Sequence, residues 1–244
     1  MTNNSDFEYK TFEIKTDSGT HPFDMVEVHA GSFMMGSDEF EESQPVHEVT
    51  INKNYYIAKY PVTQSLWTAI MGNNPSHFKG ENRPVEKITS SDAKKFIKKL
   101  NDLYDDEDSK QFHLPTESQW EFAARAGEEG AKEKLKYAGS NRIKEVGWYY
   151  KNSNGATKPV GLKMPNQLGL YDMSGNVWEW CEDNYIENYH RHPKDGSALI
   201  NDNRLLVVRG GSWFNNDDFC SVFNRNGVNL VVRVYFVGFR LSRY

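Results

Sequence analysis

Residues 131–203 constrain the fold most, because this long stretch sustains neither a helical nor a strand period. The stretch is rich in Gly, Asn and Asp and carries short aromatic runs such as "WYY" and "WEW". Irregular connections of this length are uncommon in compact domains; they are either functional loops or parts of folds that tolerate much coil. Regular patterns lie mainly outside this stretch, so we expect an α+β domain with short strands, a few helices and high coil content.

Three helices are predicted upstream, each with recognisable ends. The first lies within "TQSLWTAIMG", residues 63–72, and the second follows a capping region at residues 90–92. The third opens at Thr116, where Gln119 has the spacing of a capping box, and Gly127 is expected to cap its C-terminus.

Short strands are predicted around these helices. "MVEVHAGSFMMG" suggests two strands about a turn at residues 30–31, and "HEVTINKNYYIA" suggests a hairpin across residues 52–54. Residues 1–22 show no clear pattern and are expected to be an N-terminal lead-in. A single domain is therefore expected over residues 23–244.

Composition excludes some classes of function. The formal net charge of −5 and the sequence pI of about 5.8 argue against a nucleic-acid binder, which would carry a basic patch. No apolar run is long enough for a transmembrane helix, and the first residues lack the pattern of a signal peptide. Cys181 and Cys220 could pair or stay free, so they do not indicate a compartment.

The common catalytic motifs are missing from the sequence. There is no P-loop, no dinucleotide-binding glycine motif, no H-E-x-x-H and no G-x-S-x-G. His190 and His192 are close in "YHRHP", but without a third ligand they are interpreted as exposed loop histidines. Cys220 stands in "DDFCSVF", where neighbouring carboxylates would raise a thiol pKa, which disfavours a nucleophile.

The motif "GLYDMSGNVWEWCEDNY" suggests a different kind of site. Trp178 and Trp180 would lie on one side of a strand, with Glu179 on the other. Turn carbonyls, the Asn176 amide and the Glu179 carboxylate could form an oxygen cage for calcium. This candidate calcium site comprises Gly175, Asn176, Val177 and Glu179. A purely structural turn capped by tryptophans is the alternative, and no cofactor is required.

Several blocks in this order resemble the formylglycine-generating-enzyme (sulfatase-modifying factor) superfamily. The blocks are "FMMGS", "HEVTINKNYYIAKYPVTQSLWTAIMG", "RPVEKITSSDAKKFIKKLN", "HLPTESQWEFAARAG", "GLYDMSGNVWEWCEDNY", "VVRGGSW" and "GFRLSR". The resemblance spans nearly the whole chain. It implies the C-type-lectin fold of this superfamily, with short antiparallel strands, a few helices and much coil.

The resemblance also places the catalytic cysteine pair of the family's enzymes. In those enzymes the two cysteines lie five residues apart, just after a Gly-Gly-Ser-aromatic block. The matching positions here are Asn215 and Cys220, so only one of the two cysteines is present. Copper-dependent thiol chemistry needs both soft ligands, and an amide is no substitute. We therefore expect no catalytic residues and no enzymatic activity.

A branch without catalysis fits better, namely the variable proteins of diversity-generating retroelements. In these proteins template adenines are copied into random bases, so that Asn codons become codons ending in C or T. Such codons never encode Lys, Glu, Gln, Met or Trp. Residues 214–237, between "RGGSW" and "GFRL", contain none of these five types, although together they make up roughly a quarter of the chain. This segment is the expected variable segment.

The resemblance implies a ligand-binding protein that displays a diversified surface. The expected ligand-binding residues are Phe214, Asn215, Asn216, Asp218, Phe219, Phe223, Asn226, Gly227, Val228, Asn229, Val231, Val232, Val234, Tyr235 and Phe236. Arg225 and Arg233 are expected to anchor the segment through hydrogen bonds to carbonyls. The expected partner is an unknown protein or surface ligand, met by a monomer at the cell surface or after secretion. A non-catalytic relative of fixed specificity and a formylglycine-generating-type oxidase are the alternatives.

Overall fold

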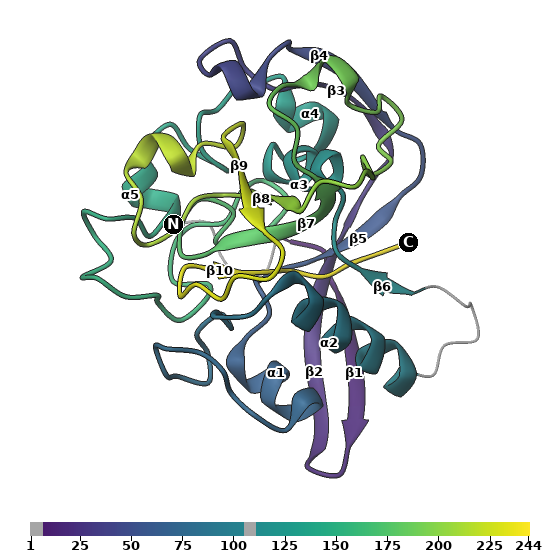
Figure 1. Cartoon of the computed structure of the whole chain (residues 1–244), viewed down its shortest axis with the longest axis vertical. Coiled ribbons are helices and arrows are strands. Elements are labelled where there is room, and N and C mark those ends of the chain that lie inside the picture. The colour runs from purple at the N-terminus through teal and green to yellow at the C-terminus, as the bar shows by residue number, and fades with distance from the viewer. Residues whose placement is uncertain (1–6, 105–110) are drawn as a thin grey trace.

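The computed structural model describes residues 7–104 and 111–244, and its strands form three sheets (Figure 1). The strands and helices are β1 (Lys10–Thr16), β2 (Gly19–Val28), β3 (Gly31–Met35), η1 (Glu41–Ser43), β4 (His47–Ile51), β5 (Tyr55–Ala58), α1 (Gln64–Met71), α2 (Ser90–Leu103), β6 (Phe112–His113), α3 (Glu117–Ala124), α4 (Gly127–Ala131), α5 (Ile143–Val146), β7 (Trp178–Asn184), η2 (Tyr189–Arg191), β8 (Leu205–Arg209), η3 (Asp217–Cys220), β9 (Arg225–Asn229), β10 (Val237–Gly238) and β11 (Ser242–Arg243). The expected α+β class with short strands and much coil is confirmed.

The largest sheet joins the two ends of the described chain in the antiparallel order β1-β2-β5-β11-β6. Its β1–β2 hairpin pairs Lys10 with Met25 and runs beside α1 and α2, with its turn at the bottom of the view (Figure 1). The prediction of a lead-in over residues 1–22 is therefore wrong from Lys10 onward. Phe12 and Ile14 alternate with exposed residues in β1, and burial of these two side chains holds the strand in the core.

The predicted hairpin across residues 52–54 is also wrong. Strands β4 and β5 flank those residues, but β4 pairs with β3, whereas β5 pairs with β2 and β11. Both strands carry apolar side chains that fill a shared cluster, so burial of those side chains outweighs the local pairing that a short connection favours.

All three predicted helices are present, although α2 already begins at Ser90 and is capped by Thr89, not by residues 90–92. Thr63 caps α1, which ends at Gly72 in the left-handed conformation, and Thr116 forms a capping box with Gln119 at the start of α3. The C-terminus of α3 differs from the prediction, because Arg125 is its cap residue. Gly127 instead begins α4, after a backbone reversal at positive φ.

The segment 214–237 is held by a four-stranded sheet in the order β10-β7-β8-β9. Strand β9 pairs antiparallel with β8, and β10 runs parallel to β7. The segment therefore leaves the sheet after β8, returns as β9, leaves again and re-enters as β10. Parts of it are regular in spite of the aperiodic sequence, because pairing to fixed strands sets the backbone.

Candidate functional site

The predicted ligand-binding residues differ widely in exposure. The exposed ones are Phe214, Asn216, Asp218, Phe219, Asn226, Val231, Val232 and Tyr235. The half-buried ones are Asn215, Gly227, Val228, Asn229, Val234 and Phe236. Most of the segment is thus accessible, in a protein whose other large apolar side chains are mainly buried. Apolar side chains gathered on a surface in this way mark interaction sites.

Two of the predicted residues are structural. Phe223 is only 5% exposed and packs with Phe40 in a core cluster, so its main role is in packing. Gly227 has no room for a side chain, because a Cβ atom there would lie 2.6 Å from the ring of Tyr185. Packing therefore constrains both positions, and a ligand contact at either one stays a prediction. The sequence could not reveal either constraint, because both depend on neighbours far along the chain.

Aromatic rings from the two ends of the segment meet in one place, which we call the aromatic cluster. Its members are His77, Phe78, Trp213, Phe214, Tyr235 and Phe236. Phe214 stacks on Phe236 at 6.2 Å between ring centroids, and Tyr235 stacks on the buried Trp213 at 6.0 Å. Phe214 is 55% exposed and Tyr235 44%. The cluster therefore offers accessible rings on a rigid base.

A loop outside the variable segment completes the cluster. The ring of His77, an exposed residue, lies 5.5 Å from that of Tyr235, and the ring of Phe78 lies 5.2 Å from that of Trp213. The backbone N–H of Phe78 donates to Glu86 Oε1 at 2.8 Å. Glu86 is fully buried, and its Oε2 has no hydrogen-bond partner within the described residues. This loop could not be predicted as part of the site, because no periodic or motif signal surrounds it.

Burial raises the pKa of Glu86 to about 7, although the Phe78 and His77 amides and the charges of Lys79 and Lys87 favour its ionised form. A carboxyl whose pKa is raised on folding stabilises the fold below its unfolded pKa of 4.5, and this contribution is lost as pH rises towards 7. Between about pH 5 and about pH 8 the free energy of unfolding of the unaltered protein should fall. In the Glu86→Gln variant this fall should be smaller by roughly 1–3 kcal/mol. Chemical denaturation at both pH values measures this difference. An unchanged pH dependence would contradict it.

Asn215 and Cys220 do not form a reactive pair. The Asn215 side-chain oxygen accepts hydrogen bonds from Trp178 Nε1 at 2.9 Å and from Ser212 Oγ at 2.5 Å. The Cys220 thiol is fully buried, and burial, more than the nearby Asp217, raises its pKa above the ordinary value. Cys181 and Cys220 are both free, so the option that they pair is excluded.

The oxygen atoms of the candidate calcium cage bind other groups of the same chain instead. Trp178 and Trp180 enter the same core cluster, and Glu179 faces the other way, as expected. The Glu179 carboxylate, however, binds the Arg240 guanidinium through both oxygens, at 2.6 and 2.7 Å. The Asn176 amide oxygen accepts the backbone N–H of Lys158. A cation already neutralises the carboxylate, which argues against calcium at residues 175–179.

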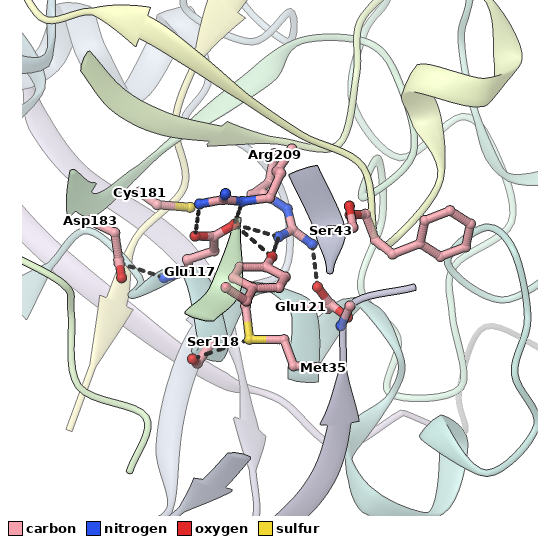
Figure 2. A network of polar contacts seen from close by, with 12 residues as sticks. Met35, Ser43, Glu117, Ser118, Glu121, Cys181, Asp183 and Arg209 are labelled. Atoms are coloured by element: carbon pink, nitrogen blue, oxygen red, sulfur yellow. Dashed lines mark hydrogen bonds and ion pairs between the residues drawn. The ribbon is translucent and has the colours of Figure 1, made fainter. Parts of the chain in front are cut away.

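A fully buried ion-pair network lies beneath the segment (Figure 2). Arg209 on β8 donates to Glu117 at 2.8 Å and to Glu121 at 2.6 Å, both on α3. Arg225 donates hydrogen bonds to both oxygens of the same Glu117 carboxylate, from Nε at 2.7 Å and from Nη2 at 2.8 Å. Arg225 also donates to the Glu42 and Ile186 carbonyls, so its predicted anchoring role is confirmed. Arg233 instead pairs with Asp92.

One cluster in this network has the composition of a metal site. Ligand atoms of Glu117, Asp183 and His192 lie within 4.8 Å of one another, and all three residues are buried. Two guanidinium groups already occupy Glu117, so a metal ion there would meet strong repulsion. His192 is buried, so the prediction that it is an exposed loop residue is wrong. His190 is exposed, as predicted. None of the helices in the described ranges combines the length and hydropathy needed to cross a bilayer.

Residues 11–244 match the family model described as "Sulfatase-modifying factor enzyme 1-like domain". The chaperone protein LppX of Paenibacillus barcinonensis is 32% identical, over 84% of this chain and 85% of its own length. The formylglycine-generating enzyme of Thermomonospora curvata is 29% identical over 66% of this chain, which spans 54% of the enzyme's length.

Among solved structures, Treponema denticola variable protein 1 is similar over almost the whole chain. The TM-score is 0.83 at 30% identity, with 96% of this chain and 98% of that one covered.

Proposed function

The chain belongs to the sulfatase-modifying factor enzyme 1-like family, and we propose that within it the chain is a non-catalytic, ligand-binding protein whose accessible segment 214–237 is diversified by a retroelement. The formylglycine-generating-enzyme type of C-type-lectin fold, expected from the sequence blocks, is confirmed by the family and by the similarity to a variable protein. The observation that carries the proposal is the aromatic cluster, where Phe214 and Tyr235 are exposed on a base of buried Trp213.

The geometry supports binding rather than catalysis. Asn215 stands where the family's enzymes carry a cysteine, and its amide oxygen accepts two hydrogen bonds. Cys220 is inaccessible and its thiol is held protonated by burial. A binding surface of this kind needs rigid aromatic anchors beside adaptable polar side chains, and the segment offers both.

The decisive experiment on diversification is to sequence the region around the gene. A second, near-identical copy of the stretch that encodes residues 214–237 should lie nearby and differ from it only at adenines. Without such a copy the retroelement proposal falls. The oxidase alternative is tested separately, by incubating the chain with copper, oxygen and a cysteine-containing peptide. We expect no turnover, and measurable turnover would overturn the non-catalytic proposal.

A binder of fixed specificity is the second candidate, favoured by the similarity to a protein named a chaperone. It would use the same accessible rings, but every copy of the gene would encode the same segment. The search for the adenine-differing copy therefore separates the two candidates. For either one we propose a monomer that meets its partner at the cell surface or after secretion, because a displayed binding surface requires access to external ligands.

A further inference from the structure

The loop that completes the aromatic cluster carries basic side chains that lie outside the variable segment. His77, Lys79 and Lys87 are all exposed. Lys87 is fixed there because its backbone N–H donates to the carbonyl of Val234 at 3.0 Å, one residue before Tyr235. Lys79 follows Phe78, and its Nζ donates to the Asn74 carbonyl at 2.8 Å. Neither lysine has an acidic ion-pair partner among the described residues.

Three acidic residues are near these lysines in the chain or in space, and the exposed one, Glu81, lines a groove beside α1 with Ser18, His21 and Thr68. Glu86 is buried, and its pKa lies near neutrality, so it carries only part of a negative charge at the pH of most cells. Asp92 is occupied by Arg233 and by the capping box of α2. Exposed basic side chains therefore outnumber exposed carboxylates in this loop beside the aromatic cluster, on a chain whose formal net charge is −5. Such local contrast steers oppositely charged partners towards a surface.

From this arrangement we infer that the site takes an acidic polypeptide segment bearing apolar or aromatic side chains, with His77, Lys79 and Lys87 as its fixed contacts. The inference rests on the proposed function, since it names the partner class of that same surface. Exposed rings in the centre with charges at the rim reproduce the anatomy of protein–protein interfaces. Val231 and Val232 are further exposed apolar side chains of the same segment, and apolar surface of this kind suits a polypeptide better than a sugar.

The fixed contacts have a consequence for specificity. Substitutions at Phe214 or Tyr235 would change which apolar side chains fit, but the basic rim would stay the same. All versions of the protein would then share a preference for acidic partners, and the segment would select among them. Basic residues at the rim act mainly on the association rate, so this preference should weaken as salt rises.

The inference is tested with two labelled random copolymers, one of Glu and Tyr and one of Lys and Tyr, titrated with the full chain by fluorescence anisotropy. We expect the Glu–Tyr copolymer to bind at least about tenfold more tightly, and to weaken severalfold between roughly 50 and roughly 300 mM salt. Dextran sulfate supplies negative charge without apolar groups and should bind less tightly than the Glu–Tyr copolymer. Equal binding of the two copolymers, or dextran sulfate binding as tightly as the Glu–Tyr copolymer, would overturn the inference.

Matched variants separate the rim from the rings. Lys79→Ala with Lys87→Ala should weaken Glu–Tyr binding at least about fivefold, whereas Lys15→Ala with Lys53→Ala, two exposed lysines on β1 and in the β4–β5 connection, should stay within about twofold. Phe214→Ala with Tyr235→Ala should also remove binding. If only the ring variants lose binding, the basic rim is refuted while the proposed binding surface stands. If neither pair has an effect, both fall.

Discussion

Glu117→Ala is expected to lower the free energy of unfolding by about 3–5 kcal/mol, because it leaves buried guanidinium charge without its partner. Arg209 and Arg225 both bind this carboxylate, at 2.8 and 2.7 Å, and all three side chains are fully buried. Arg209 would keep Glu121, but Arg225 has no other carboxylate within the described hydrogen bonds. The melting temperature should fall by roughly 10 °C, as measured by circular dichroism.

The control for this variant is Asp102→Ala. Asp102 pairs with Lys98 on the exposed face of α2 at 2.9 Å, a contact that solvent screens. Its loss should change the stability by at most about 0.5 kcal/mol. If the two variants shift the melting temperature equally, the buried network does not stabilise the fold in the way argued.

The network also predicts an acid transition. Burial alone would raise the pKa of Glu117, but Arg225 and Arg209 outweigh burial and hold it well below 4.5. A carboxyl with a depressed pKa stabilises the fold above its unfolded pKa, and this contribution is lost as pH falls below that value. The free energy of unfolding should therefore fall progressively below about pH 4.5, as chemical denaturation at a series of pH values would measure, while the Glu117–Arg225 contact persists in the molecules that stay folded.

The sequence predicted those parts of the fold that local chemistry decides. Thr63, Gly72 and Thr116 fix helix ends by capping, and the structure places them as expected. Pairing that depends on distant strands was missed, because nothing in "HEVTINKNYYIA" shows that β4 and β5 belong to different sheets. The site follows the same division. The ends of the variable segment can be recognised in the sequence as "RGGSW" and "GFRL". The loop with His77 joins the site only through tertiary contacts, which the sequence does not show.

Arg209 shows where more could have been read from the sequence. It ends the apolar run "LLVVR" in a strand whose neighbours are buried, and a buried guanidinium needs a carboxylate close by. The block "HLPTESQWEF" supplies two, Glu117 and Glu121, one helical turn apart and therefore on one face of α3. The pairing could have been proposed from these two blocks, although its distances could not.

Phe223→Ala and Phe214→Ala test whether the segment divides into core and surface as the structure indicates. Both residues are phenylalanines of the variable segment, so the substitution removes the same atoms. Phe223 is 5% exposed, and its ring contacts the ring of Phe40 and the guanidinium group of Arg125. The Phe223→Ala substitution should therefore leave a cavity and lower the free energy of unfolding by about 3–5 kcal/mol. Phe214 is 55% exposed, and its loss should cost less than about 1 kcal/mol.

The expected gap between these two variants is roughly 6 °C or more in melting temperature, measured by differential scanning calorimetry under one set of conditions. Binding of the Glu–Tyr copolymer should show the opposite order, with Phe214→Ala the weaker binder under conditions where both variants are folded. Equal melting temperatures would mean that Phe214 is as much a part of the core as Phe223. Diversification could not then be confined to accessible positions, since random replacement of a core ring would unfold most copies, and the proposed function would lose its physical basis.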